Sequence, residues 1–540
     1  MYTREVRDVY SSLEYVGRIV EKATPESFIF VTSREKHPPK YEYVVVKSHE
    51  VVGGGIEEVF VLCQVKDVFS ISSAYSSKLD LNTLERIYQV GIDDTNLLCE
   101  ARALGFLCDE EGKTVVKTPR RALFPGNPVY LAPDDLVRKF FSYPLSEGLH
   151  VGALVSRLGV DVYLSVNGLR RHLAVIAQTG AGKSYTVGVI LEELMKLGAT
   201  VVVIDPHADY VFLSRGVDMS RHEYSDRVVV FRNPDSSGRY DPSELDDVRE
   251  LTVKFSDLSL SDIAEIAGIP EHWTNVRKAV KNAIYALRKK GDYDLHDLLE
   301  ILESMARESK RESLHAERAY NHLSNMMKFR VFGKHTTPVD QEILKPGQVS
   351  VLDLSGLNDA SQDYIVSWVL KEVFKLRHTG VFPYPVFVVI EEAHRFVPSK
   401  DSERHTMSSP IIKTIASEGR KFGVFLILVT QRPSKIDSDV LSQCNSQIIL
   451  RITNPRDQRA VANASERLGS ELMTDLPGLN VGEAVIVGEL TRVPVIVKVR
   501  RRFTREGGAD IDLVGELKRA RESILLKPSR STAKGLMSEV

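Results

Sequence analysis

The segment that most constrains the fold runs from Leu173 to Ser184, where an apolar run passes into a loop of small residues ending in Gly-Lys-Ser. Apolar residues at helical spacing follow the loop. A strand, such a loop and a helix in this order are typical of a phosphate-binding loop, in which backbone N–H groups surround the phosphates of a nucleotide. The first loop position holds Ala177 instead of the usual Gly, and Ala is small enough for the turn.

The residues of this loop have separate expected roles. Lys183 is expected to reach the β- and γ-phosphates of ATP, and the hydroxyl of Ser184 to bind Mg²⁺. The helix that follows points its positive end at the anion. A glycine-rich turn without a ligand is the alternative, which the register of the loop residues disfavours. The residues expected to contact ATP are Gln178, Thr179, Gly180, Ala181, Gly182, Lys183, Ser184 and Tyr185.

Length and composition add further limits. A chain of 540 residues is too long for one hydrophobic core, so two or three domains are expected. The net charge of −2 means that any site for a polyanion must come from local clusters. The four cysteines have no Cys-x-x-Cys spacing and are typical of reduced thiols. With no signal peptide pattern and no apolar run long enough to cross a bilayer, we expect a cytoplasmic protein without membrane contact.

The sequence predicts five regions. Closely spaced β-branched and aromatic runs predict a small N-terminal β-barrel with a linker at residues 1–150. Strand–helix alternation typical of an ATPase core occupies residues 151–242 and 331–505. A helical insertion separates these two parts at residues 243–330, and a polar tail with one helix follows at residues 506–540.

Continuous apolar runs in the core predict a parallel sheet that is covered on both faces. A β-hairpin is expected near residues 482–499. The six expected buried strands are residues 173–177, 201–205, 349–354, 386–391, 424–431 and 447–452.

Two adjacent carboxylates, Glu391 and Glu392, end one of these apolar runs. The carboxyl end of a parallel strand faces the ligand crevice of the sheet. Glu391 is therefore expected to hold Mg²⁺ through its water shell, and Glu392 to orient and activate the attacking water. The alternative, acids at the start of a helix, is disfavoured by the phosphate-binding loop upstream.

Three further polar residues lie next to predicted strands. Arg420, on the turn before the strand at 424–431, is expected at a domain edge where it would meet a neighbouring subunit's nucleotide, or else to form a surface salt bridge. Gln431 ends that strand and is expected to sense the γ-phosphate. Asp205 ends the strand at 201–205, where it either orients water or the metal shell or caps the turn before Pro206.

Two basic stretches have two interpretations each. Arg277, Lys278, Lys281 and residues 288–290 lie in the helical insertion, where they form a solvated helix face or contact DNA, and the solvated face is the favoured interpretation. Residues 498–505 contact DNA or have a solvated or intersubunit role.

Together these segments resemble the HerA family of hexameric DNA translocases, in the FtsK–HerA branch of RecA-like P-loop motors. The resemblance covers most of the chain. It is carried by the barrel, by Arg171-His172 before the phosphate-binding loop, and by Asp205-Pro-His207, Glu391-Glu392-Ala-His394, Gly419-Arg420 and Thr430-Gln431.

This resemblance implies an α/β fold with a RecA-like P-loop ATPase core, an N-terminal β-barrel and a helical insertion. It implies a homohexamer around double-stranded DNA that works with a NurA-type nuclease in DNA end resection and recombination repair. Glu392 is then the catalytic base, Arg420 an arginine finger that acts in trans, and Arg171 and Asp205 further positions for ATP turnover. Ala208-Asp209 departs from the family's usual Gly-Glu, which leaves the role of Asp209 open.

Two other functions fit the same residues. A related P-loop motor would move another cargo, either protein or single-stranded nucleic acid. A nucleotide-switched scaffold would recruit a nuclease and hydrolyse little ATP. The intact pair of Glu391 and Glu392 argues against the scaffold, because a switch does not need the catalytic base.

Overall fold

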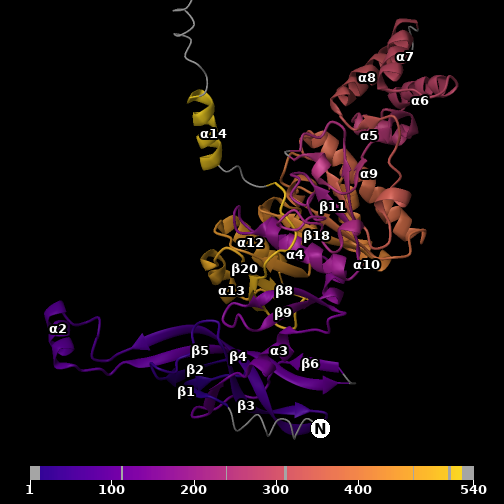
Figure 1. Ribbon diagram of the computed structural model, residues 1–540. Helices are drawn as coiled ribbons and strands as arrows, with labels where there is room; N and C mark the ends of the chain where they lie inside the picture. The colour runs from indigo at the N-terminus through magenta and orange to yellow at the C-terminus, as the bar shows by residue number, and fades with distance from the viewer. Residues whose placement is uncertain are drawn as a thin grey trace, which may run out of the picture.

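The computed structural model describes residues 13–110, 113–238, 240–308, 313–465, 467–508 and 513–525. A β-barrel lies at one end of the molecule, a helical bundle at the other, and an α/β body between them (Figure 1). Within the described ranges, no helix is both long enough and apolar enough to cross a membrane.

Six strands close into the N-terminal barrel. The order β2-β1-β7-β3-β4-β5 returns to its start because β5 also pairs with β2, and β6 (Lys113–Lys117) continues from β5. Closure leaves these six strands without a free edge. The free thiols Cys63 and Cys99 lie in the barrel core. The strands of the barrel are β1 (Tyr15–Ala23), β2 (Ser27–Thr32), β3 (Tyr43–Val52), β4 (Gly55–Ile71), β5 (Asn96–Glu110) and β7 (Pro128–Leu131).

The predicted barrel is confirmed, but the sequence did not indicate β5, the strand that closes it. Helix α2 (Leu81–Val90) lies on a long arm between β4 and β5 and stands away from the barrel (Figure 1). Helix α3 (Asp134–Phe141) connects the barrel to the body.

The body is built on a single sheet of 12 strands in the order β13-β12-β16-β11-β17-β18-β10-β19-β20-β21-β8-β9. Strands from β13 to β19 are parallel, and those from β19 to β9 are antiparallel. Strand β18 lies between β17 and β10, which is the RecA-like order.

The six predicted buried strands are confirmed, with ends that differ by a few residues. They are β10 (Leu173–Ile176), β11 (Thr200–Asp205), β16 (Val349–Asp353), β17 (Val386–Ile390), β18 (Val424–Thr430) and β19 (Ser446–Ile449). The expected hairpin is β20 (Glu483–Val487) with β21 (Val495–Val499). The remaining strands of the sheet are β8 (Gly148–Leu154), β9 (Asp161–Ser165), β12 (Val228–Arg232) and β13 (Val248–Glu250).

Helices cover both faces of this sheet, which explains its continuous apolar strands. Ala174 and Ile176 of β10 join one hydrophobic core, whereas Leu173 and Val175 join the core on the other face. The helices of the body are α4 (Lys183–Lys196), α9 (Asp359–His378), α10 (Ser409–Phe422), α11 (Ser438–Gln443), α12 (Pro455–Ala464) and α13 (Ser470–Asp475).

The helical bundle leaves and rejoins the body at neighbouring points, because β14 (Val253–Lys254) before it pairs with β15 (Phe332–Gly333) after it. Its helices are α5 (Leu260–Ile266), α6 (Thr274–Arg288), α7 (Leu295–Glu308) and α8 (Ser313–Ser324).

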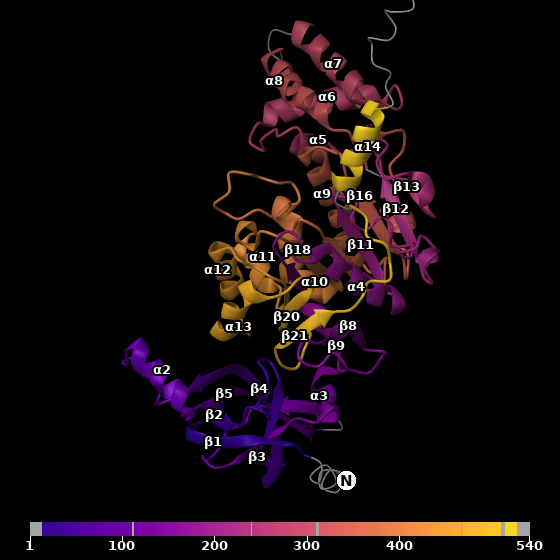
Figure 2. The ribbon, with the colours of Figure 1, turned by 60° about the vertical axis from the view of Figure 1, so that its left-hand side comes forward.

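The chain after β21 crosses α4 before it reaches α14 (Leu513–Leu525) (Figure 2). Arg500 binds Glu192 at 2.7 Å and Glu193 at 2.9 Å. Glu192 also accepts a hydrogen bond from the backbone N–H of Thr504 at 2.7 Å. The Arg502 side chain is buried, with 2% of the residue exposed. The basic stretch 498–505 therefore places two of its arginines inside the subunit, where they hold the chain against α4.

This contact predicts a large effect of a small substitution. In Gly188→Ala, the new Cβ would lie 2.7 Å from Cδ of buried Arg502 and closer still to its guanidinium. We expect a lower thermal unfolding midpoint, corresponding to a loss of about 1–3 kcal/mol, because overpacking forces the neighbours apart. The matched control is Gly159→Ala, whose Cβ would meet nothing within 4 Å. Equal midpoints for the two variants would contradict the tight packing of Arg502 on α4.

Candidate nucleotide-binding site

The carboxyl ends of four neighbouring parallel strands form the candidate site. Strands β11, β17, β18 and β10 are adjacent and point the same way. The phosphate-binding loop follows β10, Asp205 ends β11, Glu391 and Glu392 follow β17, and Gln431 follows β18. The sheet thus brings these sequence-predicted residues to one edge, where α/β proteins bind ligands.

The loop between β10 and α4 has a left-handed backbone conformation at two of its glycines. Gly180 and Gly182 have φ values of 75° and 97°, in the left-handed region that favours glycine. Ala177 continues the strand, because its N–H donates to the carbonyl of Thr430 at 3.2 Å, so no glycine is needed there. The side chain of Gln178 accepts a hydrogen bond from the hydroxyl of Thr453 at 2.8 Å, which fixes the start of the loop.

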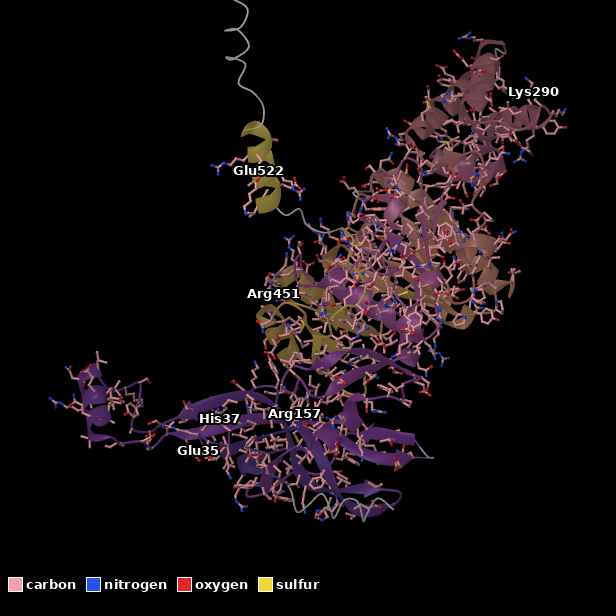
Figure 3. All side chains as sticks on the ribbon, viewed as in Figure 1. Glu35, His37, Arg157, Lys290, Arg451 and Glu522 are labelled. Carbon is pink, nitrogen blue, oxygen red and sulfur yellow. The ribbon has the colours of Figure 1, made fainter. Side chains whose placement is uncertain are left out.

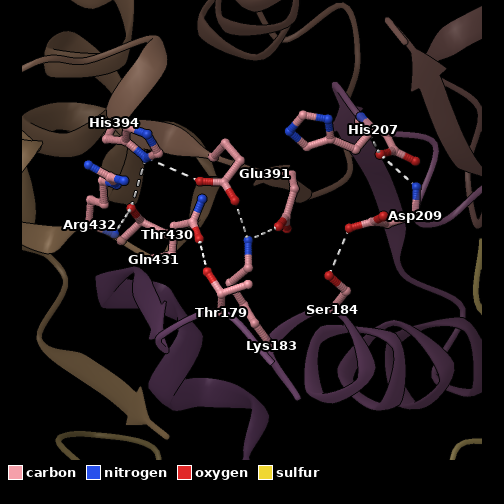
Figure 4. Close-up of polar contacts among 12 residues, drawn as sticks. Thr179, Lys183, Ser184, His207, Asp209, Glu391, His394, Thr430, Gln431 and Arg432 are labelled. Atoms are coloured by element: carbon pink, nitrogen blue, oxygen red, sulfur yellow. Dashed lines mark hydrogen bonds and ion pairs between the residues drawn. The ribbon is translucent and has the colours of Figure 1, made fainter. Parts of the chain in front are cut away.

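Lys183 lies against both carboxylates of the site (Figure 4). Its ammonium group contacts Glu391 and lies 2.7 Å from Oε1 of Glu392. Burial alone would lower the pKa of Lys183, but the two carboxylates outweigh it and raise that pKa. Burial raises the pKa of Glu391, and Lys183 offsets only part of this effect. Three charges thus share a site from which water is largely excluded.

Ser184 is held by a residue outside the predicted site. Its hydroxyl donates a hydrogen bond to Oδ2 of Asp209 at 2.7 Å. The carboxylate of Asp205 accepts from the backbone N–H groups of Asp209 at 3.0 Å and Tyr210 at 2.9 Å, so Asp205 caps this turn. Ala208 has a φ of 62°, which explains why glycine suits this position. The sequence signal for Asp209 was a second acid four residues after the strand-ending acid.

Tyr210 and His394 also reach the carboxylates, and neither was among the predicted site residues. The hydroxyl of Tyr210 donates to Oε2 of Glu391 at 2.8 Å. Nδ1 of His394 lies 3.2 Å from Oε2 of Glu392 and 3.1 Å from the hydroxyl of Thr430. Burial lowers the pKa of His394 to about 4. Tyr210 therefore orients Glu391, whereas Oε2 of Glu392 accepts no hydrogen bond from the described residues.

Gln431 contacts the phosphate-binding loop directly. The hydroxyl of Thr179 donates a hydrogen bond to Oε1 of Gln431 at 2.6 Å (Figure 4). The end of β18 is therefore joined to the loop by a side-chain hydrogen bond. Tyr185 lies on the first turn of α4, and its hydroxyl oxygen accepts a hydrogen bond from the backbone N–H of Arg502 at 2.7 Å.

The structure does not bring Arg171 and Arg420 to this edge within one chain. Arg171 ends the 3₁₀ helix Val166–Arg171 just before β10, and Arg420 lies in the last turn of α10 just before β18. Arg420 is therefore on a helix, not on the predicted turn. Both arginines lie at the amino edge of the strands, and the seven residues of β18 separate the two edges by roughly 20 Å.

His172 connects the segments that carry these two arginines. Its Nδ1 accepts the N–H of Leu426 at 2.9 Å, so Nε2 carries the proton and donates to the carbonyl of Ala416 at 3.1 Å. Ala416 lies one helical turn before Arg420 on α10. The ring is 2% exposed, and burial lowers its pKa to about 4. His172 thus fixes α10 relative to the start of β10.

The burial of neutral His172 predicts a pH dependence of stability. The pKa of His172 is 6.5 in the unfolded chain and about 4 in the folded chain. At pH values between these two, His172 therefore binds a proton in the unfolded chain and not in the folded one. Stability is therefore lost as the pH falls through this window, by about 2 kcal/mol at pH 5 for this residue. Thermal unfolding midpoints at pH 7 and pH 5 measure this loss.

The matched variant is His172→Gln, which keeps a donor and an acceptor but does not titrate. We expect the thermal unfolding midpoint of this variant to lie below that of the parent chain at pH 7. The gap between the two midpoints should be smaller at pH 5, because only the parent chain loses the stability that depends on neutral His172. A difference that stays constant between the two pH values would contradict the assignment of a neutral His172.

Three features define this chain as a P-loop ATPase with RecA-like strand order. They are the phosphate-binding loop, the paired carboxylates after β17 and the polar residue after β18, the strand that lies between β17 and β10. The family model described as "Helicase HerA, central domain" matches residues 149–373, and "Helicase HerA-like C-terminal" matches residues 339–520. The chain belongs to the HerA helicase family.

Individual relatives agree with this assignment. A DNA double-strand break repair helicase HerA from Pyrococcus furiosus is 32% identical over 546 residues, covering 90% of this chain and 92% of the relative. A probable helicase from Methanocaldococcus jannaschii is 32% identical over 476 residues, covering 84% and 86%. Among solved structures, the bacterial conjugative coupling protein TrwBdeltaN70 is 14% identical, covers 69% of this chain and 93% of that chain, and has a TM-score of 0.48.

Proposed function

We propose that this chain is an ATP-driven double-stranded DNA translocase or helicase. The observation that carries the ATPase activity is the contact of Lys183 with Glu391 and Glu392 at the end of the phosphate-binding loop. The DNA activity is supported by relatives named DNA double-strand break repair helicase HerA. By family resemblance it works as a homohexamer with a NurA-type nuclease in end resection.

In this proposal each residue of the site has one role. Lys183 binds the β- and γ-phosphates of ATP. Ser184, Asp209 and Glu391 would hold Mg²⁺ through hydroxyl and carboxylate oxygens, the donor types that this ion prefers. The ion would neutralise phosphate charge. Glu392 positions the attacking water and accepts its proton.

Arg420 completes the site of a neighbouring subunit in the proposed ring. Its side chain is exposed in the single chain and lies at the sheet edge opposite Lys183. A ring that places this edge against the next subunit's nucleotide would direct the guanidinium to the γ-phosphate. Arg171, linked to α10 through His172, lies at the same edge.

The first test measures ATP hydrolysis with and without linear duplex DNA. We expect the duplex to stimulate turnover several-fold, since a translocase couples hydrolysis to movement. Glu392→Gln should reduce turnover by about 10²–10⁴-fold with or without DNA, because it removes the general base. ATPase activity indifferent to duplex would favour a motor for another cargo, and an unaffected Glu392→Gln variant would contradict the assigned base.

The second test asks whether Arg420 acts in trans. Arg420→Ala alone should lower turnover by about 10³-fold or more with ATP binding retained, because the γ-phosphate loses its charge partner. Co-expression with Glu392→Gln chains should restore part of the activity, since a mixed interface contains one intact Glu392 and one intact Arg420.

The control for this test is co-expression of Arg420→Ala with chains that carry both substitutions, in which no interface is complete. Recovery in the first mixture and none in the control supports action in trans. No recovery in either mixture contradicts it.

A further inference from the structure

Helix α6 carries apolar and basic residues on opposite faces. At about 100° per residue, Lys278, Lys281, Tyr285 and Lys289 fall on the side opposite the buried residues. Together with Lys290 just beyond the helix, these residues are called the α6 basic face. The helix contains no Asp or Glu. Its buried residues are Val276, Ala279, Val280, Ala283, Ile284 and Leu287.

The lysines of this face differ from the two lysines of α9 in their partners. Among the described residues, no carboxylate lies within ion-pair distance of Lys278, Lys281 or Lys289. On α9, by contrast, Lys371 pairs with Glu265 and Lys375 pairs with Glu372, each at 3.0 Å. The solvated face of α9 therefore neutralises its lysines within the chain, whereas the α6 basic face keeps its positive charge for an external partner.

An exposed aromatic ring lies among these lysines. Tyr285 is 65% exposed, and the ammonium of Lys289 lies 4.4 Å from the centroid of its ring. Because Tyr285 is so exposed, its hydroxyl can donate a hydrogen bond to a phosphate oxygen. Lysines interleaved with an aromatic residue on one face are the pattern expected of a nucleic-acid contact.

The position of the face suits a linear polyanion. Lys290 is at the end of the molecule that lies away from the barrel (Figure 3). Eleven residues separate Lys278 from Lys289, so the row is about 16 Å long. This length corresponds to about five base-pair steps of a duplex at ~3.4 Å each.

We propose that the α6 basic face binds the phosphate backbone of duplex DNA at the end of the subunit away from the barrel. The contact is independent of base sequence, because ammonium groups act on phosphates as point charges. It is also separate from the nucleotide site. This inference rests on the proposed function as a duplex DNA motor.

The test uses the full chain and a fluorescent 40-base-pair duplex of mixed sequence, with affinity measured by anisotropy over a series of salt concentrations. The triple variant Lys278→Gln, Lys281→Gln and Lys289→Gln should weaken binding about tenfold or more and flatten the slope of log K against log salt by about 2 to 3. Substitution of the same three lysines by Arg should leave the slope of log K against log salt unchanged, because the positive charges are kept. ATP hydrolysis without DNA should be unchanged, because the face does not touch the nucleotide site.

A matched control removes three exposed lysines of the barrel region that make no ion pair within the described part of the chain, with Lys22→Gln, Lys36→Gln and Lys78→Gln. A smaller loss in the control supports a local contact on α6. Equal losses in both triple variants, or an unchanged slope in the α6 variant, overturn it while the proposed function stands. Failure of the unmodified chain to bind any duplex overturns both.

Discussion

The contact between Lys183 and the carboxylates of Glu391 and Glu392 constrains the rest of the structure. These charges are costly to bury apart, since an unpaired buried charge is strongly destabilising. They meet because β10 and β17 run parallel with β18 between them, so that their carboxyl ends share one edge. The surrounding hydrogen bonds, from Tyr210 to Glu391 and from Ser184 to Asp209, fix the positions of these side chains at the same edge.

The local parts of the site could be predicted from the sequence. A continuous apolar run predicts a strand buried on both faces, and small residues with Gly-Lys-Ser predict a loop that approaches phosphate. The barrel followed from its short alternating strands, but β5 was missed because polar residues such as Glu100 and Arg102 interrupt its apolar pattern. Local patterns give the elements, and pairing between distant strands decides which element closes the barrel.

Contacts between distant segments could not be predicted. His394 is eight residues beyond the start of β17, yet its role depends on Thr430 of the next strand. The two basic stretches show the same limit. Arg500 binds Glu192 and Glu193 more than 300 residues earlier, as separations of 308 and 307 residues show. The lysines of α6 have no such partner among the described residues, although the two stretches look alike in composition.

The segment that crosses α4 also constrains how the subunit is made. Glu192 and Glu193 are synthesised long before their partners Arg500 and Thr504, which follow more than 300 residues later. A nascent chain that has not yet reached these residues leaves both carboxylates of α4 without their counter-charges. The helix that follows the phosphate-binding loop therefore gains these contacts only after the segment with Arg500 and Thr504 has been synthesised, so its final packing comes later than its own synthesis.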